Sequence, residues 1–327
     1  MSKKKVFALL VTIFFLVIIF YKIDIHEVIE TFKVFDFKNL WLIVILYMFS
    51  MYLRGFRWKA LLLEDKKYTA LELAENFVMG VFLNIFLPAR GGDLYRAYKL
   101  GKTKDERKMK VLGSILIERT FDGICVFLIL LFAVIMYCKE KWIINLSYTV
   151  GILFIGCFIA FYLIYKYNKI DYIFEKILGI TKKFLPEKYH SKISDILGFI
   201  NNQLNFFVEG FEALNSFKYT LKAFIFSLLP WGVECVVAYL IINSFNMPIG
   251  FAASLFVISL ISFSTMIPSA SSFVGPYQYA YILALGIFGI DKSTTLGIST
   301  IHQAILLLTQ GLMCSCIVLK NNFLAKK

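Results

Sequence analysis

The sequence NIFLPARGGDLYRAYKLGK, residues 84–102, and the nearby VLGSILIERTFDGICVF, residues 111–127, decide how this chain is interpreted. In the first stretch an apolar run stops at a proline, and a turn with two glycines and several charges follows. In the second, an apolar run contains Glu118, Arg119 and Asp122. A charged side chain inside a membrane costs about 2.5–3.5 kcal/mol on insertion scales and usually marks a pathway or a site. We therefore expect the functional centre where these two stretches meet.

The composition places the chain among helical membrane proteins. Of its 327 residues, 59% are hydrophobic and 17% are aromatic, whereas globular chains are about 45–50% apolar. Several apolar runs reach the roughly 20 residues that a spanning helix needs. We expect an all-α polytopic integral membrane protein with a single transmembrane domain over residues 1–327, and no large soluble domain.

The apolar runs predict eight spans and one re-entrant segment. Residues 71–87 are apolar but carry several polar groups and end before Pro88, and basic blocks flank them on both sides. Keeping both blocks on the inner side requires a segment that dips into the membrane and returns, which protein or a water-filled cavity must cover. The eight spans are expected at residues 6–21, 37–53, 111–137, 146–165, 219–243, 251–267, 277–290 and 296–319.

The formal net charge of +13 has two interpretations, nucleic-acid binding and membrane topology. The basic residues lie mainly in loops between apolar runs, which is the pattern of the positive-inside rule. With the expected spans, 28 Lys and Arg residues lie on the inner side, 6 on the outer side, and Arg119 within the membrane. We expect both termini in the cytoplasm and no nucleic-acid partner.

An inner loop, residues 166–217, divides the chain into two comparable halves, residues 1–165 and 218–327. Apolar residues at helical spacing, with lysines between them, predict amphipathic helices on the membrane surface in this loop. Each half contains one interrupted segment, the first at Pro88 and the second at Pro268. Paired interrupted segments point to a transport site at the interface of an inverted repeat, although a chance likeness explains the pattern equally well.

Two groups of residues are candidates for contacting a phosphate. Glycines at the start of the turn allow close approach of the backbone, and arginine offers a planar donor fork that matches phosphate. Basic residues after the second span also read as an interfacial anchor with Trp58. The alternative is that the turn with Arg90, Asp93 and Arg96 is a cytoplasmic loop whose charges serve only the membrane topology. The candidate headgroup site consists of Arg54, Arg57, Arg90, Asp93 and Arg96.

Polar residues within the spans are candidates for lining an intramembrane groove. Glu118 and Asp122 share a helix face because they are four residues apart. The alternative is an internal ion-pair network that only joins helices. Single polar groups such as Glu234 and His302 are usually interhelical hydrogen-bond partners. A role of Glu234 or His302 in proton transfer is a further interpretation. We expect Glu234 on a fifth span that is broken at Pro230 and Gly232. The groove candidates are Glu118, Arg119, Asp122, Glu234, Gln278 and His302, and the broken-helix backbone is assigned to Pro88, Gly91, Gly92, Pro268, Gly275 and Pro276.

The chemistry of soluble enzymes is not indicated. The chain has three histidines and six cysteines, but no CxxC pair, no cluster with metal-ligand spacing and no nucleophile elbow. We expect no cofactor and no metal, and whether the protein is an enzyme stays open, with a non-catalytic role favoured.

Taken together and in order, the motifs resemble the membrane region of lysylphosphatidylglycerol synthases, which is also called the flippase-like domain. The motifs are RGFRW at 54–58, LPARGGDLYR at 87–96, IERTFD at 117–122, PSA at 268–270 and GPYQ at 275–278. The resemblance covers nearly the whole chain. This sequence departs from the family pattern at Asp93, where the family commonly has Glu, at Ser271 and Ser272, where it has Pro-Gly, and at Gln278, where it has an acid.

The resemblance implies a helical bundle with re-entrant elements in a prokaryotic plasma membrane. It further implies movement of a phospholipid, such as lysylphosphatidylglycerol, or of a polyprenyl-phosphate-linked lipid across the bilayer. In the full-length synthases a separate soluble domain transfers lysine from lysyl-tRNA, and we expect that domain to be absent here. The alternatives are a membrane transferase of the phosphatidylglycerol lysyltransferase type and a non-catalytic partner of a separate synthase or glycosyltransferase.

Overall fold

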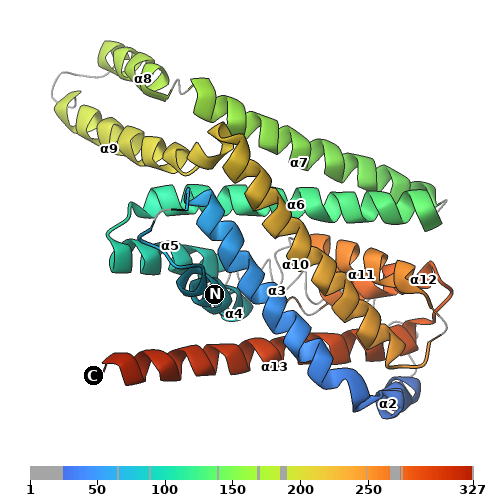
Figure 1. The fold of residues 1–327 in the computed structure, drawn as a ribbon. Helices are drawn as coiled ribbons and strands as arrows, with labels where there is room; N and C mark the ends of the chain where they lie inside the picture. The colour runs from blue at the N-terminus through green and yellow to red at the C-terminus, as the bar shows by residue number, and fades with distance from the viewer. Residues whose placement is uncertain are drawn as a thin grey trace.

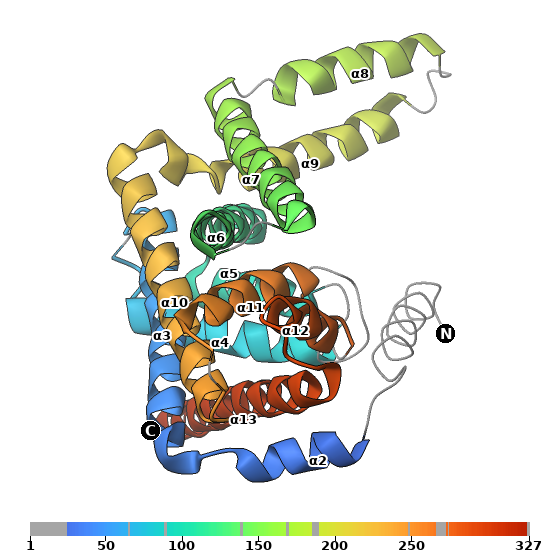
Figure 2. The same ribbon diagram turned by 90° about the vertical axis from the view of Figure 1, so that its right-hand side faces the viewer.

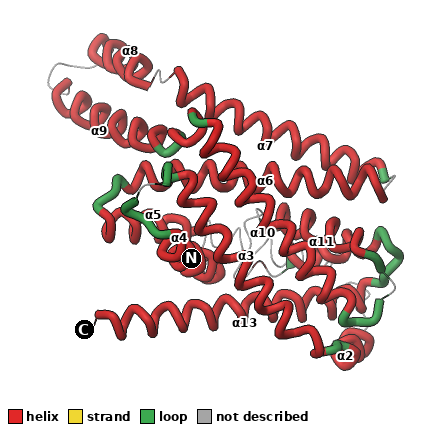
Figure 3. The backbone as a smooth tube through the Cα atoms, viewed as in Figure 1, coloured by secondary structure: helices red, strands yellow, loops and turns green. Residues whose placement is uncertain are grey.

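The computed structural model describes residues 25–325, apart from residues 65, 88–89, 138–139, 168–169, 185–189, 248, 266–272 and 274. The first expected span, residues 6–21, lies outside this part, and so do Pro88 and Pro268. Every regular element in the described ranges is a helix (Figure 3). The expected all-helical architecture is confirmed.

Five of the described helices are long and apolar enough to cross a membrane. They are α3 (Leu40–Leu61), α6 (Lys108–Tyr137), α7 (Lys141–Tyr167), α10 (Phe217–Asn243) and α13 (Lys292–Ala325). The sixth and seventh expected spans form α11 (Phe251–Ser264) and α12 (Pro276–Gly286), which have 14 and 11 residues. Both are shorter than the roughly 20 residues of a spanning helix, so the count of eight spans is not confirmed.

The long helices α3 and α10 run side by side, across the middle of the view in Figure 1 and along one edge of the molecule in Figure 2. Figure 2 shows the pair α6 and α7 near one end of α3 and α10, and α13 near the other end. The Lys222 ammonium, on α10, donates a hydrogen bond to Glu64, just after α3, and thereby holds the pKa of that carboxyl below its ordinary value. Helices from both halves of the sequence therefore build one shared core.

The expected break at Pro230 is wrong, because α10 continues through this proline from Phe217 to Asn243. A proline inside a helix removes one backbone hydrogen bond. An open loop at the same depth would leave several backbone groups unsatisfied in hydrocarbon. A continuous helix is therefore the less costly arrangement.

The interrupted segment of the first half forms a helical hairpin from α4 (Ala70–Phe86) and α5 (Gly91–Lys104). The helices approach closely at two glycines, since a Cβ added to Gly92 would lie only 1.9 Å from the carbonyl oxygen of Gly80. The backbone N–H of Gly92 also donates a hydrogen bond of 2.8 Å to the Asn84 side chain. This contact fixes where α5 begins, and therefore where its charged residues point.

The inner loop contains two helices, α8 (Ile170–Phe184) and α9 (His190–Glu209), as its periodicity predicts. They form a hairpin that projects from the body beyond the end of α7 (Figures 1 and 2). Asp171 accepts hydrogen bonds of 2.8 Å from Asn201 and from Asn205, and these bonds lower the pKa of its carboxyl. The two remaining elements of note are α2 (Ile25–Val34), which packs on α13, and a short 3-10 turn, Glu212–Asn215, before α10.

Candidate functional site

Helix α3 presents a stripe of polar residues at intervals of three or four positions. The stripe comprises Tyr47, Ser50, Arg54 and Arg57, and all four side chains are buried. The expectation that the two arginines follow the end of the span is wrong, because α3 continues to Leu61. Both arginines therefore lie inside the helix, where they need partners from neighbouring helices.

Glu118 on α6 provides the innermost of these partners. Arg96 from α5 holds it with two parallel hydrogen bonds, Nη1 to Oε1 at 2.9 Å and Nη2 to Oε2 at 2.8 Å. Nη2 of Arg57 lies 3.0 Å from the same carboxylate, and all three side chains have no exposed surface. The Arg96 guanidinium also lies over the rings of Trp58 and Phe77, at 4.2 and 4.7 Å from their centroids. These groups are enclosed by protein.

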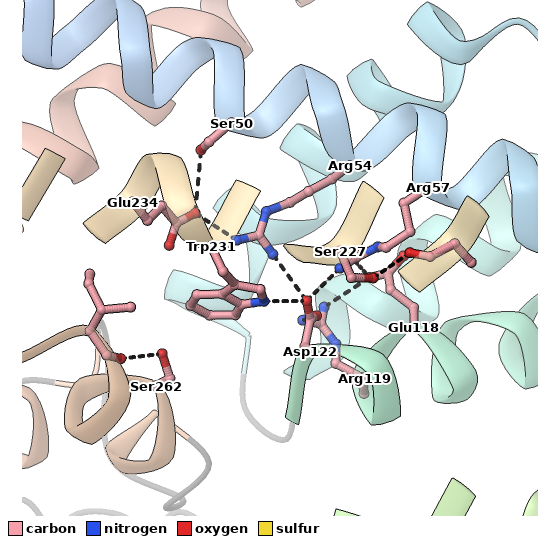
Figure 4. A network of polar contacts seen from close by, with 12 residues as sticks. Ser50, Arg54, Arg57, Glu118, Arg119, Asp122, Ser227, Trp231, Glu234 and Ser262 are labelled. Atoms are coloured by element: carbon pink, nitrogen blue, oxygen red, sulfur yellow. Dashed lines mark hydrogen bonds and ion pairs between the residues drawn. The ribbon is translucent and has the colours of Figure 1, made fainter. Parts of the chain in front are cut away.

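Asp122 lies one turn further along α6 and connects α3 with α10. Its Oδ1 is 2.5 Å from Nη1 of Arg57 and accepts a hydrogen bond of 2.9 Å from the indole of Trp231. Arg54 bridges two carboxylates, with Nη1 3.6 Å from Asp122 and Nη2 2.6 Å from Glu234 on α10 (Figure 4). One arginine of α3 thus joins acids from two other helices.

Arg119 and Asp93 form the more accessible edge of the site. Nη2 of Arg119 is 2.9 Å from Asp93 on α5, and Nη1 is 3.5 Å from Asp122. The Arg119 side chain is 24% exposed, whereas that of Arg57 is fully buried. The sequence predicts an irregular turn over residues 90–96. In the structure α5 already begins at Gly91, so Asp93 lies in the first turn of this helix.

We call these eight residues the arginine–carboxylate cluster. The cluster contains four arginines and four carboxylates, so its formal charge is zero. Glu118 follows the start of α6 by ten residues, or roughly 15 Å at 1.5 Å per residue, and is therefore well inside this helix of 30 residues. Buried charges persist only when they are paired and hydrogen-bonded. The members are Arg54, Arg57, Asp93, Arg96, Glu118, Arg119, Asp122 and Glu234.

Arg90 adds a positive charge beside the cluster. Its backbone is left-handed, with φ 55°, and its guanidinium donates a hydrogen bond of 3.3 Å to the carbonyl of Thr265 at the end of α11. Among the residues that the structure describes, Arg90 forms no ion pair with a carboxylate. The turn before α5 therefore touches the end of α11 and leaves an arginine available to an anion.

Two of the expected groove residues lie elsewhere. Gln278 donates a hydrogen bond of 2.6 Å to Gln303 and accepts one from the backbone of Gly275. It thereby caps α12, whose first residue is Pro276. His302 on α13 is buried against the Tyr281 hydroxyl. Both side chains are therefore held by α12 and α13 rather than by the arginine–carboxylate cluster.

Sequence reasoning missed several residues that complete the site. Ser50 donates to Glu234, Trp231 donates to Asp122, and Trp58 covers Arg96. Helical spacing offered a signal, since Trp231 precedes Glu234 by three positions and so shares its helix face. Within the described ranges, no group of three or more His, Cys, Asp or Glu side chains is placed to hold a metal ion.

Comparison with known proteins gives one family match and several relatives. The family described as lysylphosphatidylglycerol synthase TM region matches residues 5–314. A UPF0104 membrane protein of Methanocaldococcus jannaschii is 26% identical over 237 residues, which cover 69% of this chain and 88% of that protein. Another, from Pyrococcus horikoshii, is 22% identical over 334 residues and covers 97% of both chains. No solved structure matches.

Proposed function

The chain belongs to the family of the lysylphosphatidylglycerol synthase transmembrane region, and on this premise we propose that it moves an anionic lipid headgroup across the membrane. A phospholipid and a polyprenyl-phosphate-linked lipid both fit this proposal, because each joins a phosphate to apolar tails. We place the protein in a prokaryotic plasma membrane, with the termini in the cytoplasm.

The observation that carries the proposal is the arginine–carboxylate cluster, deep within the long helices and beside a helical hairpin. An ion-pair network that only joined helices would need no exposed cation. Here Arg119 is partly exposed and Arg90 is held by a carbonyl group alone among the described residues. Arg90 and Arg119, at the accessible edge of the cluster, can bind a phosphate together, because each guanidinium donates parallel hydrogen bonds to phosphate oxygens.

The arrangement of the hairpins supports a path for the headgroup. The hairpin α4–α5 belongs to the first half of the sequence, and α11–α12 is the corresponding short pair of the second half. The hydrogen bond from Arg90 to Thr265 joins them. On our proposal both pairs are re-entrant, related by an inverted repeat, and they separate in turn to expose the arginines to either side while the lipid tails stay in the bilayer.

The test is lipid transfer by purified protein in vesicles that contain a fluorescent phosphatidylglycerol or phosphatidylcholine. We expect phosphatidylglycerol to be transferred faster in vesicles that contain the protein than in empty vesicles. Arg119→Ala should slow it by about tenfold or more, since a hydrogen bond to a charged group is worth about 1.5–3 kcal/mol. Arg107→Ala is the matched control, because Arg107 pairs with Glu209 at an exposed site.

Four measurements decide the outcome of this test. Equal rates in empty and protein-containing vesicles would contradict the proposal, and so would an Arg119→Ala variant as fast as the unmodified protein. The melting temperature of Arg119→Ala must be measured alongside, because this arginine also pairs with Asp93 and Asp122. Arg119→Lys keeps the charge but loses the planar fork, and we expect it to recover only part of the rate.

A further inference from the structure

The hairpin of α8 and α9, which we call the arm, projects from the body of long helices. Asp171 of α8 accepts hydrogen bonds from Asn201 and Asn205 of α9, and these bonds tie the two helices together. Figure 2 views α6 nearly along its axis, and in this view the arm reaches sideways past α6 and α7. Because α6 is long and apolar enough to cross a membrane, this direction runs along the membrane surface.

Each helix of the arm has an apolar stripe that its partner does not cover. The side chains of both stripes are exposed. They recur at intervals of three or four residues, which places each stripe on one face of its helix. An exposed apolar surface of this kind marks a contact with protein or with a membrane. The stripe of α8 consists of Ile173, Ile177 and Ile180, and that of α9 consists of Ile196, Ile200 and Leu204.

The stripe of α8 follows directly on the apolar surface of α7. Protein covers little of that helix, since only 17% of its most apolar stretch is buried. Leu163, Ile164 and Tyr167, in its last turns, are exposed, and α8 begins three residues later at Ile170. The chain therefore leads from a helix that faces lipid straight into the stripe of α8, and the same bilayer can cover both.

The direction of the arm is fixed by close packing of α9 on α6. A Cβ added to Gly113 of α6 would lie 2.0 Å from the carbonyl oxygen of Phe207. A Cβ added to Gly210 would lie 2.3 Å from the carbonyl oxygen of Lys110. Two backbones that approach this closely leave no room for the arm to swing, because side chains can move aside but backbone atoms cannot. The stripes therefore stay beside the membrane surface.

The charges of the arm favour an anionic surface. Lys176 and Lys192 are exposed, and at about 100° per residue each lies within about 40° of a residue of its stripe. The exposed acids Glu175 and Asp195 lie about 100° or more from every stripe residue. Lysines that flank an apolar face are typical of helices on a membrane surface, and the anionic lipids of the cytoplasmic leaflet attract them.

We propose that the arm docks on the inner leaflet beside the protein and binds anionic lipid there. The two stripes lie among the headgroups, and Lys176 and Lys192 contact their phosphates. Burial of the stripes holds the arm on the surface, and the lysines give the preference for anionic lipid. This contact is separate from the arginine–carboxylate cluster and does not require that the protein moves a headgroup.

The test places a polarity-sensitive dye on opposite faces of α9. Ile200→Cys puts the dye on the stripe, and Asn202→Cys, about 200° away, puts it on the opposite face. Each variant is made in a cysteine-free background, checked for folding by circular dichroism, and reconstituted into vesicles of phosphatidylglycerol and phosphatidylcholine with spin-labelled acyl chains. We expect these chains to quench the dye about fivefold more strongly at residue 200, because only the apolar face of an interfacial helix reaches the acyl boundary.

The preference for anionic lipid is tested with the same dye at residue 200. In vesicles of phosphatidylcholine alone we expect the quenching to fall by about half or more, since the attraction of the lysines is lost. Replacing both lysines, with Lys176→Gln and Lys192→Gln, should have the same effect in vesicles that contain phosphatidylglycerol. Lys218→Gln is the matched control, because Lys218 is exposed at the start of α10, outside the arm.

Several outcomes would overturn the proposal. Equal quenching at residues 200 and 202 would do so, and so would quenching that is as strong in phosphatidylcholine alone. A dye at residue 200 that is exposed to water would leave the stripe to a soluble protein, and a dye that is shielded from water but not quenched would assign it to a second copy of the chain. Ile173→Cys and Glu175→Cys repeat the comparison on α8, so that the result does not depend on one substitution.

Lipid transfer measured in the same vesicles separates this inference from the proposed function. Docking of the arm without lipid transfer would contradict the proposed function alone. Transfer by a protein whose arm stays in water would contradict the docking alone.

Discussion

Glu118→Ala is expected to destabilise the protein strongly, because it removes the acid at the centre of the arginine–carboxylate cluster. The substitution leaves Arg57 and Arg96 fully buried without the carboxylate that both now contact. Removing one partner of a buried ion pair typically costs about 3–5 kcal/mol. We expect a fall in melting temperature on the order of 10 °C, judged from about 2–4 °C per kcal/mol in chains of 150–250 residues.

The melting temperature is measured with a thiol-binding dye. The thiols of Cys125 and Cys235 are buried and react with the dye when the helices separate. Glu209→Ala is the control. It breaks the exposed pair with Arg107, which is worth less than about 1 kcal/mol. Melting temperatures of the two variants that agree within error would show that the Glu118 carboxylate does not hold the helices together.

Gly92→Ala should abolish lipid transfer, although it adds only one methyl group. Its Cβ would lie 1.9 Å from the carbonyl oxygen of Gly80, and a backbone atom cannot rotate away as a side chain can. Overpacking of this kind costs about 1–3 kcal/mol and occasionally more. The hairpin α4–α5 must open, which carries Asp93 and Arg96 away from α6. Activity is measured by the fluorescent-lipid assay.

Gly232→Ala is the matched control for that variant. No atom lies within 4 Å of the position where its Cβ would stand. Alanine favours a helix over glycine by up to about 1 kcal/mol, so this variant should be as stable as the unmodified protein or slightly more so. If Gly92→Ala transferred lipid as fast as Gly232→Ala, the close packing of α4 on α5 would not be needed for function.

The helical class of the fold and the buried acids of the candidate site could be predicted from the sequence for a simple reason. Acidic residues within a long apolar run are so costly in hydrocarbon that their positions alone reveal a polar centre. Glu118 and Asp122, four positions apart, were expected to share a face, and both join the same arginine–carboxylate cluster. Local periodicity likewise predicted the helices α8 and α9.

The partners of these acids could not be predicted, because they come from distant parts of the chain. Arg54 and Arg57, next to Trp58, match the ordinary pattern of a helix end at the membrane surface. Only the packing of α3 against α6 and α10 shows that these arginines are interior. The sequence alone does not separate His302 and Gln278 from these acids, because polar residues in spans look alike. In the structure His302 contacts Tyr281 of α12, and Gln278, on α12 itself, contacts Gln303 of α13.

The separation of the paired charges along the chain has a consequence for biosynthesis. Arg57 and Asp122 are 65 residues apart, and Arg54 and Glu234 are 180 residues apart. When α3 leaves the ribosome, neither arginine has its acid, and two unpaired arginines cost roughly 5–7 kcal/mol on insertion scales. We therefore expect the nascent α3 to stay beside the translocon until α6 is synthesised, and its insertion to be complete only when α10 supplies the last carboxylate.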